Sequence, residues 1–490
     1  MLVATLLNFA ALLRPVRPPV VRSTAPRAAL VDSLQEYLTT PAEELGTKSK
    51  ETRDIDWLKQ WYPLAHTRAL RKAEPNAMRL LETPLVAWQS ADGWAVAEDR
   101  CPHRGAPLSY GRLEANSTLT CSYHGWQFGS TGETAYVPVR RKQGCAASLR
   151  IHPSRVCEYG LLWVWPVSVV PGSAEEEAAF ATKLPIDHLP APGNSVTDWT
   201  VNRVPVPWAS LLENTLDDAH GVHAHHGFAG LDRALARPAS KVISGQVGQG
   251  ESFVTWANVS GPLVASEAAS ESENQRDSWV NSYQFTAPHR TTVRFGPEFQ
   301  LQGFIVPASY DETLLVSAAF SKSGPGVGGR LLKGTQLANP FLTAVLHRLG
   351  TTTVCQDAVL AEADGLDDLR GERWTGEKTR GGLTSSDGAV HRLRGWMRRS
   401  GGPPLRPARD DVKRWQPRHQ LSVWEMHTRD CPTCRRAHDD AKATAKVLLV
   451  ASVAAAASGQ LPTALALVAH AELSRAVSRW FEVFDVRFDK

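Results

Sequence analysis

Alternating apolar and polar residues mark the first part of the chain as a region of short strands. The stretch VAWQSADGWAVAED alternates on both sides of an Asp92–Gly93 turn, and GLLWVWP is a continuous apolar run that ends at Pro166. Alternation with a period of two is typical of antiparallel strands with one buried face, and a short apolar run is typical of a fully buried strand. The pattern therefore predicts a small antiparallel β domain, to which we assign residues 54–168.

A second domain is predicted for residues 190–425. Its segments TTVRFGP, EFQLQGFIVPA and ETLLVSAAF have strand patterns, and Asp311 lies at a turn between two of them. Such strands form an antiparallel sheet, and we expect a helix around Asp357 to cover it. The segment from Gly365 to Pro417 is rich in arginine, glycine and proline and is predicted to form long loops. The expected fold class is α+β.

The C-terminal part, residues 445–480, is apolar and is predicted to be helical. The run VLLVASVAAAASGQLPTALALVAHA is interrupted by Gly459, Gln460 and Pro462, so each half is too short to span a bilayer as a helix. The whole run is long enough if the break is tolerated. Two structures therefore fit: a membrane anchor, which we expect, or an alanine-rich helical hairpin packed on the protein.

Composition indicates a folded protein and gives no argument for nucleic acid. With 490 residues, 42% of them hydrophobic, and a formal net charge of +4, the chain can bury two sizeable cores. Residues 1–45 are assigned to a targeting segment, because four arginines and no acid precede Asp32. A plastid transit peptide and a bipartite signal both fit. Simple secretion is disfavoured, because the cysteines fall in metal and dithiol motifs rather than in a disulfide scaffold.

Two loops combine a cysteine with a histidine at short spacing, Cys101-x-His103 and Cys121-x2-His124. Two cysteines and two histidines can hold either one zinc ion or a two-iron cluster. Zinc sites usually pair cysteine with cysteine and histidine with histidine, whereas each loop here offers one of each. This arrangement favours a Rieske [2Fe–2S] centre, in which two cysteines bind one iron and two histidines bind the other. A zinc knuckle is the alternative.

A second metal site is predicted in LLENTLDDAHGVHAHHG, residues 211–227, which includes His220 and His225. Non-haem iron oxygenases hold Fe(II) with two histidines and one carboxylate and leave positions open for dioxygen and substrate. A separation of five positions advances too far around an α-helix to keep both histidines on one face. The helix is therefore expected to be distorted or to end between them. His223 and His226 are competing ligands.

A third motif lies in residues 426–440, where Cys431-Pro432-Thr433-Cys434 has the spacing of a redox dithiol. Neighbouring arginines favour a thiolate, so regulation by thioredoxin is expected. A zinc site that recruits His427 and His438 is one alternative, and a pair of surface cysteines without chemistry is another.

Together these motifs resemble the Rieske mononuclear iron oxygenases, in the plastid branch that includes pheophorbide a oxygenase. The resemblance extends over DWLKQWYPLA, DRCPHRGAPLSYGRL, CSYHGWQF, YGLLWVWP, SLLENTLDDAHGVHAHHG and the cysteine pair near the C-terminus, which marks this branch. It implies that the Rieske domain is followed by a helix-grip catalytic domain, an antiparallel sheet with helices. The cluster ligands that it implies are Cys101, His103, Cys121 and His124.

The resemblance also implies that His220 and His225 bind the mononuclear Fe(II) together with a downstream carboxylate. The best candidate is Asp357, in TTVCQDAVLAEAD, and its competitors are Glu362 and Asp364.

Asp217 has a different implied role. An acidic residue at this place hydrogen-bonds an iron-binding histidine and a Rieske histidine of the neighbouring subunit, which forms the bridge that electrons cross and implies a homotrimer. The sequence departs from the family pattern at two places, and both affect the expected entrance of the pocket. Asp218 stands in place of proline, and Gly221–Val222–His223 stands in place of aromatic or proline residues.

The activity implied by the resemblance is ferredoxin-dependent insertion of oxygen from O2 into a tetrapyrrole, foremost the oxygenolytic ring opening of pheophorbide a in chlorophyll breakdown. The implied location is a thylakoid or inner envelope membrane of the plastid. Hydroxylation of another chlorophyll intermediate or of a phyllobilin is the alternative within the enzyme class. From another class, a redox-sensing electron-transfer component of the plastid import machinery is the alternative, although intact iron ligands speak against it.

Overall fold

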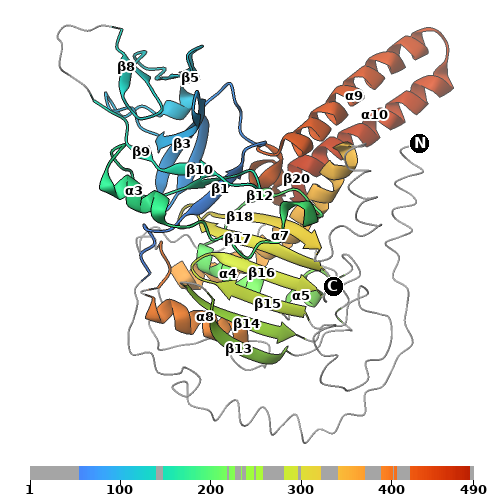
Figure 1. Cartoon of the computed structure of the whole chain (residues 1–490). Coiled ribbons are helices and arrows are strands. Elements are labelled where there is room, and N and C mark those ends of the chain that lie inside the picture. The colour runs from blue at the N-terminus through green and yellow to red at the C-terminus, as the bar shows by residue number, and fades with distance from the viewer. Residues whose placement is uncertain are drawn as a thin grey trace, which may run out of the picture.

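The computed structural model describes a β-rich N-terminal part, a large sheet with helices, and a long helical hairpin that projects from the body (Figure 1). The described residues are 55–138, 147–217, 220–226, 233, 239–247, 250–257, 281–295, 299–321, 340–369, 388–400, 402–405 and 420–485. The predicted targeting segment, residues 1–45, lies outside them. The expected α+β fold class is confirmed.

Three small antiparallel sheets form the N-terminal part, as the alternation of apolar and polar residues predicts. The strands of the first sheet, in sheet order, are β1 Tyr62–His66, β11 Leu161–Val164 and β10 Ser154–Val156. Those of the second sheet are β2 Asn76–Leu80, β3 Thr83–Ser90, β4 Gly93–Glu98 and β9 Ile151–His152. β11 is the continuous apolar run seen in the sequence, and all its residues are buried. β3 and β4 pair through Ser90 and Gly93, which confirms the predicted turn.

The third sheet of this part carries the two Cys/His loops. Its strands, in sheet order, are β5 Arg112–Leu113, β6 Leu119–Thr120, β7 Gln127–Phe128 and β8 Thr134–Tyr136. The first loop lies between β4 and the 3₁₀ turn η1, Leu108–Tyr110, and the second loop connects β6 with β7. A buried cluster that includes Trp88, Leu108 and Phe128 packs both cysteines against the sheet of β2, β3, β4 and β9. This core fixes the bases of the two loops relative to each other.

A seven-stranded antiparallel sheet forms the centre of the second part. Its strands, in sheet order, are β12 Thr200–Val204, β18 Thr313–Ser321, β17 Phe299–Pro307, β16 Arg290–Phe295, β15 Asn281–Thr286, β14 Gly250–Ala257 and β13 Ala239–Val247. The three strand segments read from the sequence are β16, β17 and β18, and Asp311 lies in the turn before β18, as predicted. Helix α3, Ala174–Ala181, and the turn η2, Pro192–Asn194, connect this sheet to the N-terminal part.

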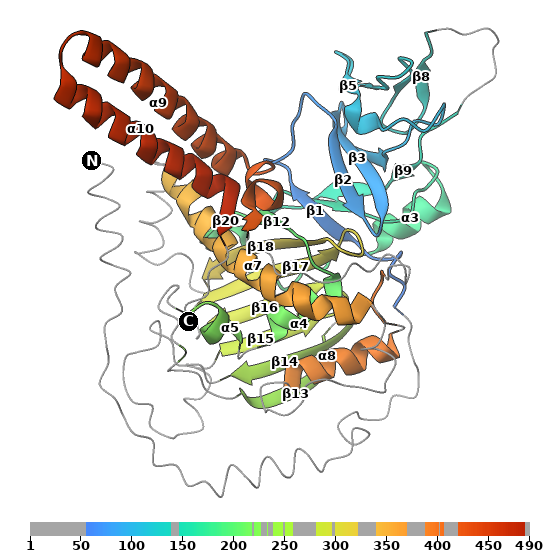
Figure 2. The same cartoon turned by 180° about the vertical axis from the view of Figure 1, so that it is seen from behind.

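Helices cover one face of the seven-stranded sheet. They are α4 Trp208–Leu216, α5 His220–Ala224, α7 Pro340–Leu369 and α8 Gly388–Arg399. Figure 2 shows the long α7 on this face, with α4, α5 and α8 on the same side of the sheet. The predicted helix around Asp357 is α7, and it covers the sheet as expected.

The prediction of long loops between Gly365 and Pro417 is wrong in two places, because α7 continues to Leu369 and α8 forms a separate helix. Residues of α8 at helical spacing, Ala389, Leu393 and Trp396, are buried against the core. This apolar stripe stands among arginines, which hide it when the composition is averaged over the segment. Residues 370–387 and 406–419 lie outside the description.

A buried ion pair joins α8 to α4. Arg394 donates from Nε and Nη2 to the two carboxylate oxygens of Glu213, at 2.9 and 2.8 Å, and both side chains are less than a tenth exposed. Removal of one partner of such a pair typically costs about 3–5 kcal/mol, because the other charge stays buried. The pair therefore fixes α4, the helix that leads directly into the predicted iron site.

The C-terminal part is a hairpin of two long helices, α9 Pro432–Ala457 and α10 Leu461–Glu482. The break between them falls at Ser458–Gln460, where Gly459 has a φ of 79°, so the interruption predicted from the sequence is confirmed. At its base lie the single π-helical turn η8, Trp424–Thr428, and the two-stranded sheet of β19, Gln420–Ser422, and β20, Val483–Asp485. None of the described helices combines the length and the apolarity needed to cross a bilayer.

Candidate functional site

The two Cys/His loops have the same backbone arrangement. In the first, the N–H of Cys101 donates to the carbonyl of Ala106 and the N–H of Gly105 donates back to the carbonyl of Cys101. In the second, the N–H of Cys121 donates to the carbonyl of Trp126 and the N–H of Gly125 to that of Cys121. Both glycines have φ near 70°, a conformation that residues with a side chain rarely adopt. Each loop therefore holds its cysteine in the same way, although the histidine follows it by two positions in the first loop and by three in the second.

The rings of the two histidines lie together, with the centroids of His103 and His124 at 4.7 Å. Both cysteines are buried, whereas His103 is exposed and His124 half-buried. Trp126 stacks on His103, whereas Tyr123 is 59% exposed and covers the site only in part. The two cysteines are thus covered by protein, whereas the two histidines reach the surface.

The electrostatics of Cys101 fit a bound cationic cluster. Burial raises the pKa of its thiol, while the main-chain N–H groups of His103 and Arg104 lower it and the neighbouring Cys121 thiol raises it. A buried thiolate pair is therefore unfavourable without a cation, and iron ions supply that charge. The residues present fit a Rieske [2Fe–2S] cluster, with the main-chain N–H groups placed to hydrogen-bond sulfur.

The second predicted metal site is assembled where α5 faces α7. Nε2 of His220 lies 3.5 Å, and Nε2 of His225 3.2 Å, from Oδ1 of Asp357. One ligand atom from each of the three residues lies within 4.8 Å of the others. α5 ends at Ala224, between the two histidines, which confirms the predicted helix end.

Each histidine of this group is oriented by a hydrogen bond from its other ring nitrogen. Nδ1 of His220 donates to the main-chain carbonyl of Asp217, and Nδ1 of His225 donates to Oε1 of Gln356 at 2.9 Å. With Nδ1 protonated, the lone pair of each ring is on Nε2 and points toward Asp357. This is the arrangement in which histidines bind metals in proteins.

The charges at this site also favour a divalent cation. Burial lowers the pKa of His220, but the Asp357 carboxylate raises it to about 9 overall. Burial raises the pKa of Asp357, and the two imidazoles lower it well below its usual range. Asp357 Oδ1 is buried and has no hydrogen-bond partner within the described part of the chain. A bound Fe(II) would take the place of the imidazole proton and satisfy this oxygen.

The other candidate iron ligands do not join the group of His220, His225 and Asp357. His223 is exposed, and Nδ1 of His226 accepts a hydrogen bond from the main-chain N–H of Arg233. Glu362 is not among the residues that converge with the two histidines, and the side chain of Asp364 lies outside the description. Asp357 therefore stands as the third ligand that the geometry supports.

Gln356 is a residue whose role the sequence did not reveal. Replacing Gln356 by leucine removes the acceptor of the His225 Nδ1–H, and we expect Fe(II) affinity to fall by about ten- to a hundredfold, as is typical when such an orienting partner is lost. Anaerobic Fe(II) titration of the metal-depleted site measures the change. Glu362→Gln, on the same helix, is the control and should bind Fe(II) as the wild type does. An unchanged affinity in Gln356→Leu would show that His225 needs no such support.

The cysteine pair near the C-terminus lies at the base of the helical hairpin. Cys431 is the N-cap of α9 and is half-buried, and Cys434 is fully buried in the first turn. The alternative of two surface cysteines without chemistry does not fit this burial. His438 lies one turn further along α9, where its Nδ1 contacts Asp439 and its Nε2 contacts Glu482, both at 2.8 Å.

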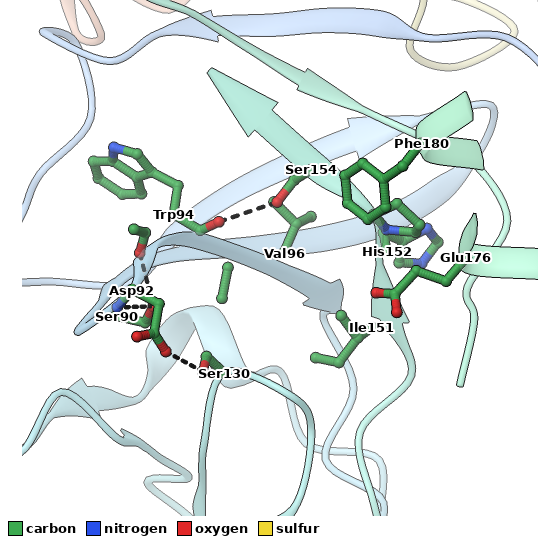
Figure 3. A pocket seen from close by; sticks show the side chains of 13 residues that line it. Ser90, Asp92, Trp94, Val96, Ser130, Ile151, His152, Ser154, Glu176 and Phe180 are labelled. Atoms are coloured by element: carbon green, nitrogen blue, oxygen red, sulfur yellow. Dashed lines mark hydrogen bonds between the residues drawn. The ribbon is translucent and has the colours of Figure 1, made fainter. Parts of the chain in front are cut away.

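A pocket on the N-terminal part lies between the strands β3, β4 and β9 and the helix α3 (Figure 3). Its lining includes Asp92, Trp94, His152 and Glu176. None of the candidate metal ligands is among the lining residues, so this pocket is separate from the metal chemistry.

Comparisons with known proteins agree with this geometry. Residues 60–153 match the family model described as the Rieske [2Fe-2S] domain. The chain is 31% identical over 268 residues to pheophorbide a oxygenase, chloroplastic, of Oryza sativa subsp. japonica, which covers 52% of this chain and 47% of that protein. It is 32% identical over 206 residues to flavonoid 8-hydroxylase 2, chloroplastic, of Ocimum basilicum, which covers 39% of this chain and 38% of that protein. The chain thus spans less than half the length of these relatives.

The fold has solved counterparts. The terminal oxygenase of carbazole 1,9a-dioxygenase from Nocardioides aromaticivorans IC177 superposes with a TM-score of 0.53 at 17% identity, over 70% of this chain and 95% of that chain. At this identity the likeness concerns the fold alone.

Proposed function

We infer that the chain is a Rieske non-haem iron oxygenase of a plastid, of the branch that includes pheophorbide a oxygenase. The observation that carries this proposal is the convergence of His220, His225 and Asp357 in a chain that also has the paired Cys/His loops. A protein that only transferred electrons would need the loops but not the three-residue group. The geometry therefore favours an oxygenase over an electron-transfer component of the import machinery.

The two groups have different tasks in this proposal. A Rieske cluster supplies single electrons from reduced ferredoxin, and a mononuclear Fe(II) supplies a site for the activation of O2. Cys101 and Cys121 would hold the cluster from the buried side, and His103 and His124 from the surface side. His220, His225 and Asp357 would hold the Fe(II) from one side, which leaves the opposite side open to substrate.

The distribution of the sites supports an assembly of several subunits. Both views show the sheet of β5 to β8, which carries the Cys/His loops, at the end of the molecule away from α5 (Figures 1 and 2). Electron tunnelling needs a short path, so a neighbouring subunit must bring its loops close to α5. The exposed His103 is suited to such a contact, and Asp217 would connect it to His220. We take a homotrimer as the working assembly.

The proposed substrate is a tetrapyrrole, foremost pheophorbide a, whose macrocycle would be opened at a methine bridge. The relative named pheophorbide a oxygenase supports this choice. Hydroxylation is the second candidate reaction, because another relative is named flavonoid 8-hydroxylase 2. The two reactions differ in their readout, since ring opening destroys the absorption of the macrocycle whereas hydroxylation of a side group preserves it.

A membrane surface is the proposed location within the plastid. The hairpin exposes apolar side chains on both helices, among them Val447, Val450, Val453, Leu461 and Leu465, each more than 60% exposed. A contact with lipid would cover them. Flotation of the protein with vesicles of plastid lipids tests this part of the proposal separately from the enzymatic part.

A single-turnover panel tests the proposed function. The anaerobically reduced protein is mixed with O2-saturated buffer and one of pheophorbide a, protochlorophyllide, a phyllobilin or a flavonoid, and both the absorbance of the pigment and the mass of the products are followed. Loss of the macrocycle absorption with pheophorbide a alone is the predicted result. A product from another member of the panel would reassign the substrate, and the absence of a product from all of them would contradict the proposed enzyme.

A further inference from the structure

A third group of potential metal ligands lies at the base of the helical hairpin. It consists of His347 from α7, His427 from η8, and Cys431 and Cys434 at the start of α9. One ligand atom from each lies within 4.8 Å of all the others. The group was brought together by three separate elements, and the oxygenase reaction uses none of its members.

The contacts within the group match the edges of one small coordination tetrahedron. Cys431 Sγ lies 3.4 Å from Nδ1 of His347, and Cys434 Sγ lies 3.3 Å from Nε2 of His427. Zinc bonds of about 2.3 Å to sulfur and 2.0–2.1 Å to nitrogen place neighbouring sulfur and nitrogen ligands about 3.5 Å apart. Each sulfur therefore already has a nitrogen at the separation that a shared ion would impose.

The two imidazoles are oriented for this purpose. Nδ1 of His427 donates to the main-chain carbonyl of Val201 on β12, at 3.1 Å, so the lone pair of that ring is on Nε2, which faces Cys434. Nε2 of His347 has no hydrogen-bond partner among the described residues, so the directed contact of this ring is the one from Nδ1 to Cys431. A pair of cysteines that cycles between dithiol and disulfide does not need two histidines aimed at its sulfurs.

The interior position of the group also favours a bound cation. His427 and Cys434 are almost completely buried, and Cys431 and His347 are half-buried. Two buried cysteine sulfurs that bind as thiolates need a cation to compensate their charge, and a zinc ion would supply it.

We propose that His347, His427, Cys431 and Cys434 bind a structural zinc ion. Two thiolates and two imidazoles in a tetrahedral arrangement suit zinc, and four protein ligands leave no position open for catalysis. A two-iron cluster would need its ligands in two pairs on separate ions, whereas these four atoms form one compact group. The histidine that completes the group is His347, and His438, whose two nitrogens contact Asp439 and Glu482, is not part of it.

The position of this zinc explains what it would stabilise. The buried apolar cluster between α7 and the hairpin is small, with Ala344, Cys434, Ala437 and Phe481 as its fully buried members. A metal that joins α7, η8 and α9 would add the cohesion that this cluster lacks.

The proposed zinc site is also linked to the candidate iron site through α7. His347 is ten residues before Asp357 on α7, which is about 15 Å along a helix. Figure 2 shows the start of α7 against the base of the hairpin. The zinc would thus hold the helix that carries the third iron ligand.

The wild-type full chain gives the first test, through zinc content by mass spectrometry and the zinc X-ray absorption spectrum. We expect about one zinc per chain, with two sulfur ligands near 2.3 Å and two nitrogen ligands near 2.0 Å. This measurement needs no variant and does not depend on activity, so it separates the zinc site from the proposed oxygenase function.

Variants give the second test. His347→Gln and Cys431→Ser should each lower the zinc content at least tenfold while the absorbance of the [2Fe–2S] cluster remains. Cys355→Ala, a buried cysteine on the same α7 that contacts Met426 instead, is the matched control and should retain zinc. If both ligand variants fail to fold, the wild-type absorption spectrum alone decides. Zinc-free protein from zinc-supplemented expression, or a Cys431–Cys434 disulfide that thioredoxin reduces, would overturn the proposal and favour a redox dithiol.

Discussion

Replacing Asp357 by alanine is expected to lower turnover by more than about a hundredfold, which exceeds the loss typical of partners that only orient a ligand. The reason is that Oδ1 of Asp357 faces both Nε2 atoms of the histidine pair, at 3.5 and 3.2 Å, and is the carboxylate that completes the group. Without it two imidazoles remain, and Fe(II) prefers sites with a carboxylate. Single-turnover kinetics with the substrate identified in the panel measures the effect.

The control for this variant is Glu362→Ala, which removes the competing carboxylate on the same helix. We expect it to keep its iron and its turnover, because Glu362 does not converge with His220 and His225. The absorbance of the [2Fe–2S] cluster should be the same in both variants. The assignment of Asp357 fails if Glu362→Ala, rather than Asp357→Ala, loses the mononuclear iron.

Replacing Asp217 by asparagine is expected to stop turnover while both metal sites stay loaded. Both metal sites should stay loaded because the main-chain carbonyl of Asp217, not its carboxylate, accepts the hydrogen bond from Nδ1 of His220. Asparagine keeps this carbonyl, so the orientation of His220 and its affinity for iron are preserved. We propose that the carboxylate contacts a Rieske histidine of the neighbouring subunit. We expect turnover to fall by at least about a hundredfold, with unchanged iron content.

Mixed assemblies test whether this path crosses between subunits. Asp217→Asn chains keep the cluster ligands, and Cys101→Ser chains keep Asp217, so each variant alone should be inactive. When the two variants are co-expressed, some interfaces bring the intact cluster of an Asp217→Asn chain next to the intact Asp217 of a Cys101→Ser chain. Activity should therefore return in part. Mixtures that stay inactive, although mass measurements show mixed assemblies, would place the path within one subunit and contradict the bridge.

The metal ligands that are close together in the sequence were predictable from it. The spacing within the two Cys/His loops indicates a cluster by itself, whereas the choice of His220 and His225 over His223 and His226 came from the family resemblance. Asp357 was predicted through a family resemblance, because a ligand that comes from a distant helix leaves no local pattern. The same limit explains why His347 was missed: it is 84 positions from Cys431, and folding of α7 against α9 brings them together.

Secondary structure was likewise predictable where a local pattern indicates it. Strands with clear alternation, such as β3 and β4, were predicted together with their turn. Helix α8 was not, because arginines surround its buried residues Ala389, Leu393 and Trp396. Its ion pair with Glu213 depends on tertiary contacts that no single segment encodes. The supporting contacts of the site, such as Gln356 with His225, belong to the same class.

We propose that one chain holds both a Rieske cluster in its N-terminal loops and a separate Fe(II) between α5 and α7. The most direct test is the ratio of total iron to acid-labile sulfide in the anaerobically purified, iron-replete protein. A [2Fe–2S] cluster contributes two irons and two sulfides, and the second site one further iron, so we expect about three irons for about two sulfides per chain. A ratio of about two irons to two sulfides would contradict it, because the residues between α5 and α7 would then hold no iron.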